Sequence, residues 1–176
     1  GAPTVAKTMG VSVDEARAFL ETYHARLPFV RATFNRAKNA AANRGWVKSI
    51  LGRYRRFEKW EPKHGRKKGL IHSEAIAAYG KDIQRALTYT ALNSVLQPSA
   101  ADLMKKAMVD IWDSGACDVL GPPLLTVHDE LAFSRPQTKA GEEAILEVKH
   151  IMEHCIELDV PIYAERESGP NWGEVK

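Results

Sequence analysis

The N-terminal part of the chain carries apolar residues at helical spacing. Residues 13–23 show this spacing, with Ser12 in front of them and Glu15 three residues later, the arrangement of a capping box. A second helix is predicted over 28–44, because a proline opens it and apolar positions continue along it. Gly45 is expected to end this helix, since glycine readily adopts the left-handed conformation that follows a helix.

The next segment has the pattern of a strand pair followed by a loop. Residues 46–51 predict a strand, Gly52 a turn, and 53–57 the partner strand. Residues 59–69 carry Pro62 and two glycines among many charges, so this stretch is predicted to be a loop.

A long helical region is predicted for residues 73–114, with interruptions near Gly80 and at Pro98. Proline has no backbone N–H to donate, so we expect Gln97 to end one helical segment and Pro98 to lie at the start of the next. The apolar positions of this next segment are expected to be buried, namely Leu103, Ala107 and Ile111, together with Met104 and Met108.

Two short apolar runs flank a polar triplet in residues 124–133. They predict a β-hairpin with His128, Asp129 and Glu130 at its tip. A helix over 138–158 and a last strand near 161–165 complete the expected elements. The predicted fold class is α+β.

Composition and charge narrow the function only slightly. A length of 176 residues permits one domain or part of a larger one, and a net charge of +3 does not by itself indicate a nucleic-acid partner. Residues 53–68, however, hold eight basic residues against two glutamates. Because Tyr54, Phe57 and Trp60 interleave with these charges, the run suits phosphate contacts combined with stacking. A solvated loop is the alternative interpretation.

The cysteines and the hydropathy of the chain bear on its compartment. Cys117 and Cys155 lack the number and spacing of a disulfide framework, which is typical of a reducing compartment. No stretch approaches eighteen apolar residues and no signal peptide opens the chain. The expected location is therefore the cytoplasm, with no membrane partner.

The polar triplet and one helical segment carry the candidate chemistry. Adjacent carboxylates at Asp129 and Glu130 repel each other unless a cation is near, which makes the hairpin a candidate metal site. Asn93 and Gln97 are four residues apart, so their amides would project from one helix face that Ala86 and Thr90 continue. Such amides can bridge acceptors in a nucleic-acid minor groove, although a polar face turned to water is the alternative.

Several of these segments together resemble the C-terminal palm of family A DNA polymerases, the bacterial polymerase I-like enzymes. The two most specific segments are 89–102, which contains Asn93 and Gln97, and 127–131, which contains the His-Asp-Glu triplet. Further counterparts follow in the same order at 21–28, 45–53, 158–161 and 169–172. The resemblance implies an incomplete domain of a right-hand polymerase, with helices packed on a small antiparallel palm sheet and a catalytic hairpin. The motifs indicate a phage source.

The resemblance implies a role for each of the site residues. Asp129 would be one of two aspartates that hold two catalytic Mg²⁺ ions, and Glu130 would assist it. His128 would contact the primer terminus. Asn93, Gln97 and Arg53 would contact the primer–template DNA, and the other substrate would be a deoxynucleoside triphosphate.

Two parts of the family's site have no counterpart in this chain. One is the second metal aspartate, and the other is the fingers helix that grips the incoming nucleotide; Tyr79 and Gly80 offer only a dipeptide of that motif. Because the chain begins with Gly1 about where that helix would end, we expect a C-terminal part that is inactive alone. It would act with an N-terminal companion chain that carries the missing aspartate. We expect helices over 1–45, a strand pair with a basic loop over 46–72, and a palm portion over 73–176.

Two other functions fit parts of the sequence. A non-catalytic DNA-binding or replication accessory module would need no complete metal site. His150, Glu153 and His154 match a zinc peptidase pattern on a helix. The polar face of that helix, exposed to water, explains the same three residues without zinc.

Overall fold

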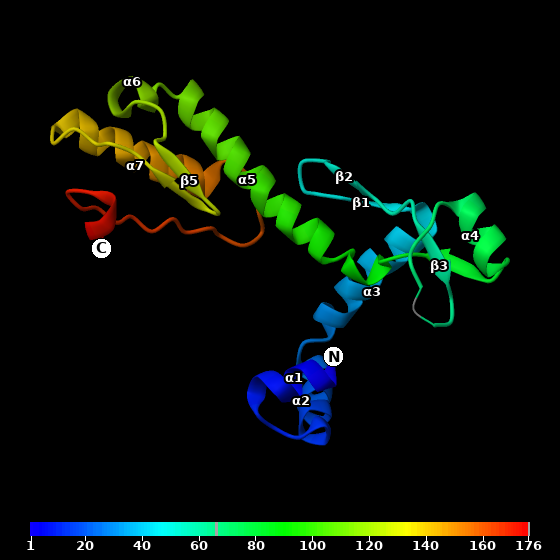
Figure 1. The fold of residues 1–176 in the computed structure, drawn as a ribbon. Helices are drawn as coiled ribbons and strands as arrows, with labels where there is room; N and C mark the ends of the chain where they lie inside the picture. Colours follow the sequence, from blue (N-terminus) through cyan, green and yellow to red (C-terminus); the bar gives the residue numbers. More distant parts are fainter. Residues whose placement is uncertain (66, 176) are drawn as a thin grey trace. The chain divides into compact units, whose positions relative to one another are not determined.

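The computed structural model describes residues 1–65 and 67–175, and Figure 1 shows their helices and strands. The chain divides into two compact units, Gly1–Leu96 and Gln97–Lys176. Helices and short antiparallel strand pairs occur in the chain, which confirms the predicted α+β class. Arg66, one of the basic residues of the predicted loop, lies outside the described residues.

The first unit begins with three helices, α1 (Ala2–Met9), α2 (Val13–Arg26) and α3 (Pro28–Arg44). The capping box of α2 is confirmed: the Glu15 backbone N–H donates to Ser12 Oγ over 3.2 Å, and the Ser12 N–H donates to Glu15 Oε2 over 2.9 Å. The Ser12 hydroxyl, which donates to Glu15 Oε2 over 2.7 Å, and the Ser12 backbone N–H together lower the pKa of Glu15. Gly45 has the expected left-handed backbone with φ of 81°, so the end of α3 is confirmed as well.

The predicted strand pair is present in a shorter form. Strands β1 (Trp46–Lys48) and β2 (Tyr54–Arg56) pair antiparallel with Val47 opposite Arg55. Val47 is buried and packs with Phe57, Ala41 and Ala91 in the core of the first unit. The hairpin is thereby attached to α3 by one of its faces.

The region after β2 differs from the prediction. The stretch expected to be a loop contains strand β3 (Trp60–Pro62), and the stretch expected to be helical contains β4 (Ile83–Arg85), which pairs with it antiparallel. Helix α4 (His72–Tyr79) lies between them in the sequence. The Arg85 guanidinium lies over the Trp60 ring at 4.6 Å and donates to the Phe57 carbonyl over 2.9 Å. These contacts join residues more than twenty positions apart, which local periodicity does not reveal.

The predicted helical face around Asn93 is also corrected. Leu87 has a left-handed backbone, the 3-10 turn η1 (Thr88–Thr90) follows it, and helix α5 (Asn93–Asp113) begins only at Asn93. Ala86 and Thr90 therefore do not share a helix with Asn93, which contradicts the expected continuous face.

Pro98 lies inside α5, and the predicted break at this residue is wrong. A proline in the second turn removes one hydrogen bond near the helix start, and the rest of this helix tolerates that loss. The division between the two compact units falls next to it, between Leu96 and Gln97. Leu103 and Met108 are only half-buried, whereas the fully buried positions of α5 are Asp102, Met104, Ala107 and Ile111.

The second unit contains the predicted hairpin on a small helical core. Its elements after α5 are α6 (Ala116–Leu120), β5 (Leu125–Val127), β6 (Glu130–Ala132), α7 (Lys139–His154) and the 3-10 turn η2 (Trp172–Glu174). Ile111, Leu120 and Val148 form the centre of this core, and Leu131 and Phe133 from the hairpin side pack against it. Thr138 caps α7, whose helix ends four residues earlier than expected.

The last predicted strand is absent: residues 161–165 have no regular secondary structure and pair with no strand. Side chains of α7 bind this segment instead. Lys149 Nζ donates to the Ala164 carbonyl over 2.6 Å, and the Ala164 N–H donates to Glu153 Oε1 over 2.9 Å. Because both backbone groups of Ala164 are satisfied by side chains, a strand partner is not needed.

Candidate functional site

The His-Asp-Glu hairpin has a two-residue turn. Val127 pairs with Glu130, so His128 and Asp129 form the turn and Glu130 is the first residue of β6. His128 has a left-handed backbone with φ of 53°, one of two such non-glycine residues in the described part of the chain. Histidine enters this region more readily than most residues, but the conformation still has an energetic cost.

The hairpin presents its polar groups to solvent while its other face is anchored. His128, Asp129 and Glu130 are all exposed. Leu131, which follows them, packs on the core of the second unit. Alternation along β6 therefore places Glu130 on the face opposite Leu131. The sequence pattern predicted the hairpin itself, because a hairpin tip and its flanking apolar residues are local features.

The two carboxylates fit part of a magnesium site. Mg²⁺ prefers oxygen ligands such as carboxylates, and a pair of them on a short hairpin is a suitable donor set. Among residues 1–65 and 67–175, no group of three or more histidine, cysteine, aspartate or glutamate side chains is arranged to hold a metal ion. Asp129 and Glu130 would be two of the ligands that such a site needs.

The remaining predicted site residues are exposed and belong to defined elements. Asn93 is the first residue of α5, and Gln97 lies one turn further along the same helix. Arg53 lies just before β2, where its backbone N–H donates to Ser49 Oγ over 2.9 Å and its carbonyl accepts from the Ser49 N–H. Arg53 and Asn93 belong to the first unit, and Gln97 and the hairpin belong to the second.

The residues of the zinc peptidase pattern have structural contacts on α7. The rings of His150 and His154 stack at 4.2 Å, and His154 Nδ1 lies 2.8 Å from the His150 carbonyl oxygen. Glu153 accepts the Ala164 N–H, which with nearby Lys149 lowers the pKa of Glu153. These contacts attach the C-terminal segment to α7. They give the Glu153 carboxylate a structural role that needs no metal.

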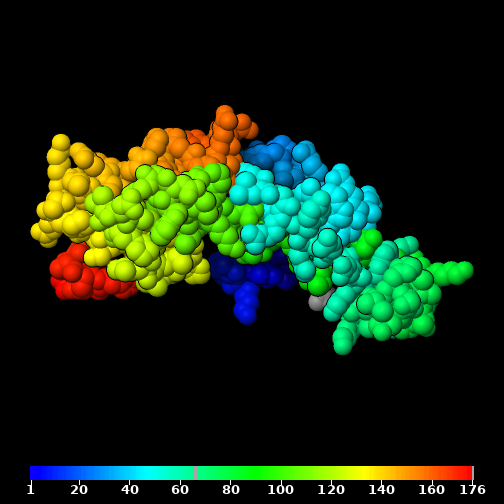
Figure 2. Space-filling view, turned by 90° about the horizontal axis from the view of Figure 1, so that it is seen from above, coloured from blue at the N-terminus to red at the C-terminus, as the bar shows by residue number. Residues whose placement is uncertain are grey.

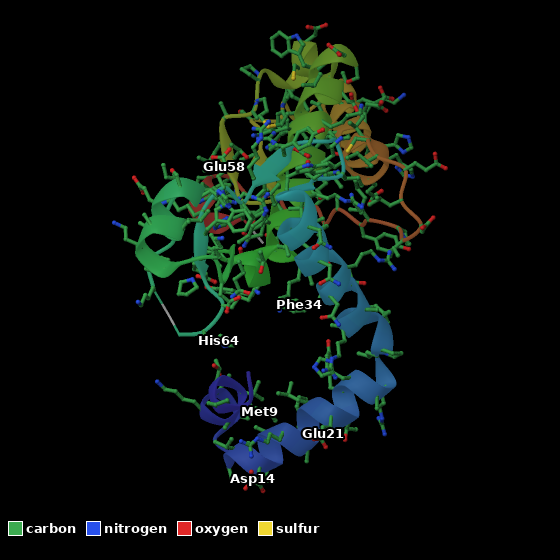
Figure 3. The ribbon with its side chains drawn as sticks, turned by 90° about the vertical axis from the view of Figure 1, so that its right-hand side faces the viewer. Met9, Asp14, Glu21, Phe34, Glu58 and His64 are labelled. Carbon is green, nitrogen blue, oxygen red and sulfur yellow. The ribbon has the colours of Figure 1, made fainter. Side chains whose placement is uncertain are left out.

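An open groove of about 880 Å³ lies in the first unit, along α2 and α3. Figure 3 labels two residues that line it, Glu21 and Phe34. None of the predicted site residues lines this groove. No helix of the described residues is long and apolar enough to cross a membrane.

Sequence reasoning missed one feature of the β1–β2 hairpin. Its exposed face carries cations and aromatic rings in contact with one another, including Lys48 and Tyr54. Side chains two positions apart in a strand share a face, so the alternation around the apolar Val47 could have indicated which side chains lie together on the exposed face.

Comparison with known proteins gives a consistent result. The chain matches the model of DNA polymerase family A over residues 1–174. The thermostable DNA polymerase I of Thermus filiformis is 34% identical over 173 residues, which cover 98% of this chain and 18% of that protein. DNA polymerase I of Pseudomonas aeruginosa is 34% identical over 174 residues, covering 97% of this chain and 17% of that protein.

A solved structure is similar over most of the chain. The POL domain of Pol1 from M. smegmatis, in complex with DNA primer-template and dNTP, has a TM-score of 0.69 and 29% sequence identity. The similarity covers 92% of this chain and 26% of that one. The chain thus spans less than a fifth of the length of the two curated relatives.

Proposed function

The chain belongs to DNA polymerase family A, and from this premise we propose that it is the C-terminal part of a template-directed DNA polymerase. The observation that carries the proposal is the exposed turn of His128 and Asp129 on a hairpin whose other face is packed on a core. Its helices over 1–45 would follow the fingers, residues 46–72 would form a strand pair with a basic loop, and 73–176 would form the palm portion.

The hairpin residues would serve the metal-dependent step. Asp129 would be a ligand of the catalytic Mg²⁺ ions, and the neighbouring carboxylate of Glu130 would assist. Two bound Mg²⁺ ions would supply activation of the primer 3′-hydroxyl and stabilisation of the leaving pyrophosphate. A carboxylate on a short, anchored hairpin suits this role, because metal ligands must be held with little slack.

The remaining site residues would position DNA. His128 would contact the primer terminus, and Asn93, Gln97 and Arg53 would contact the primer–template duplex. An asparagine or glutamine amide both donates and accepts hydrogen bonds, so it can pair with the acceptors of either base pair in the minor groove. Arg53 would contact backbone phosphate as a cation.

Activity would require a companion that supplies the second metal aspartate and the nucleotide-binding helix. The absence of a three-residue ligand group among the described residues supports this requirement. It also favours a second candidate, a DNA-binding or accessory module without catalysis. The two candidates differ in whether Asp129 matters for primer extension.

A primer-extension assay tests the companion requirement. We expect no extension by the purified chain with primer–template, deoxynucleoside triphosphates and Mg²⁺, since one hairpin cannot hold two metal ions. We expect extension when an N-terminal family A polymerase chain carrying the missing aspartate is added, and none by that companion alone. Robust extension by the 176-residue chain without a partner would overturn the companion requirement.

A further inference from the structure

The exposed face of the β1–β2 hairpin carries alternating cations and aromatic rings. Lys48 Nζ lies 5.5 Å from the centre of the Trp46 ring and 4.5 Å from that of the Tyr54 ring. Arg44 lies over Trp46 at 5.7 Å, and Arg56 lies over Tyr54 at 5.6 Å. The two rings themselves meet edge to face at 5.0 Å. We call these five residues, Arg44, Trp46, Lys48, Tyr54 and Arg56, the cation–ring ladder.

Strand register explains why the ladder forms on one face. Trp46 pairs with Arg56, and Lys48 pairs with Tyr54, so the four strand residues of the ladder lie on the same side of the hairpin. Val47 lies between them on the other side, where it is 4% exposed. The core therefore fixes the hairpin and leaves the ladder facing outward. Figure 2 shows atoms of this part of the chain, in cyan, at the molecular surface.

Acidic residues are sparse around the ladder in the sequence, where Glu58, two positions after Arg56, is the nearest one. Residues 22–57 contain nine arginines and lysines and no aspartate or glutamate. Within the described residues, Arg44, Lys48 and Arg56 form no ion pair with a carboxylate. Other cations of the chain do, for example Lys106 with Asp110 at 2.7 Å. Three positive charges on one face thus remain available to an anion.

We propose that the cation–ring ladder binds the phosphate backbone of DNA, as a contact additional to the site residues named above. The proposal takes its ligand from the proposed function, and none of the five ladder residues belongs to the site assigned there. A row of cations without carboxylates gains affinity by releasing the counterions of DNA. It reads no base sequence, because phosphates carry no sequence information directly.

The rings explain why these cations would bind better than isolated lysines on a surface. An ammonium or guanidinium group over an aromatic face is attracted to the ring, which restricts its position without neutralising its charge. Side chains restricted in this way lose less conformational entropy on binding. Tyr54 lies between Lys48 and Arg56, so its ring holds two of the three cations.

Metal-free DNA binding at a series of salt concentrations tests the proposal. The probe is a fluorescein-labelled primer–template duplex, measured by anisotropy without Mg²⁺ and without nucleotide. The triple variant R44Q/K48Q/R56Q is expected to bind on the order of tenfold or more weakly near 0.1 M salt. Its salt dependence, log K against log salt concentration, should be shallower by about 0.9 for each lost phosphate contact.

Two sets of control variants separate the contribution of the ladder to DNA binding from effects of net charge and of misfolding. The triple variant R17Q/K106Q/K139Q removes three cations that are paired with carboxylates, and it should retain affinity and salt slope close to those of the parent chain. Tyr54→Leu keeps every charge but removes the shared ring, so it should weaken binding while Tyr54→Phe does not. An unchanged slope in the ladder triple, or an equal loss in the control triple, would overturn the proposal.

The metal-free binding assay and the primer-extension assay together distinguish this proposal from the proposed polymerase function. Asp129→Ala should bind the metal-free duplex as the parent chain does, because Asp129 is not in the ladder. Failure of primer extension with a companion would contradict the polymerase proposal and leave the ladder result standing. If the ladder triple variant bound the duplex as tightly as the parent chain does, only the inference about the ladder would be contradicted.

Discussion

At the scale of single residues, the backbone of His128 is the most informative feature of the site. Most non-glycine residues avoid its left-handed conformation, with φ of 53°, because of the steric cost. Strained residues of this kind occur preferentially at functional sites. Here the strained residue directly precedes Asp129, in the turn that would present the metal ligand. The sequence identified the His-Asp-Glu triplet, but it did not predict this backbone conformation.

Replacing His128 by glycine should stabilise the fold. Relief of the left-handed conformation, worth about 1–2 kcal/mol, should exceed the entropic cost of an added glycine, about 0.5–1 kcal/mol. The free energy of unfolding, measured with urea, is therefore expected to rise, by up to about 1.5 kcal/mol. Thr126→Gly is the matched control in strand β5, where no left-handed conformation is relieved and stability should fall. Equal destabilisation by both variants would contradict strain at His128.

At the scale of elements, local signals predicted structure well and distant pairings were missed. The capping box at Ser12, the helix end at Gly45 and the hairpin of residues 124–133 depend on neighbours within a few positions, and all three are present. The pairing of β3 with β4 depends on contacts such as that of Arg85 with Trp60, which no local pattern encodes. Hydrophobic periodicity alone therefore assigned a helix to residues that form a strand.

The C-terminal segment shows a related error. Its residues 161–165 have the composition of a strand, yet no strand lies beside them among the described residues. Ionic side chains of α7 take that place: Lys149 and Glu153 bind Ala164, and Glu142 accepts from Arg166. Bonding of a segment by side chains from a helix is a tertiary feature, so the sequence predicted a strand where the structure has none.

Attachment of this segment should weaken in acid. The hydrogen bond from the Ala164 N–H, with the charge of Lys149, lowers the pKa of Glu153, and Arg166 lowers that of Glu142. A lowered pKa in the folded state means that the stabilising contribution is present above the ordinary carboxyl pKa and is lost as the pH falls through the folded value. We expect hydrogen-exchange protection of the Ala164 N–H, corrected for intrinsic exchange, to be constant above about pH 5 and to fall below about pH 4.5.

Charge-neutral variants provide the control for this pH dependence. Glu153→Gln should lower the protection of Ala164 at neutral pH and remove most of its change in acid. Glu147→Gln changes an exposed carboxylate of the same helix and should leave the profile intact. An identical acid profile in the Glu153→Gln variant would show that another group controls the segment.

At the scale of the whole molecule, the family relationship covers nearly the whole chain, while the proposed metal site would need a second aspartate from outside it. The family match covers residues 1–174, yet the chain spans less than a fifth of two curated relatives. The sequence predicted the hairpin and its acidic tip because they are contiguous. A complete metal site joins residues distant in sequence, and a second aspartate is not encoded here in a recognisable motif. The central claim is therefore that Asp129 is a metal ligand of an assembled polymerase.

The most direct test measures primer extension by the Asp129→Ala variant assembled with an N-terminal companion, alongside binding of the same primer–template without metal. We predict that extension falls to background while binding stays at the level of the parent chain, because the substitution removes a metal ligand and no DNA contact. Asp159→Ala, which changes an exposed carboxylate elsewhere in the second unit, should extend primers normally. Undiminished extension by the Asp129→Ala assembly would contradict the assignment of this hairpin as a catalytic metal site.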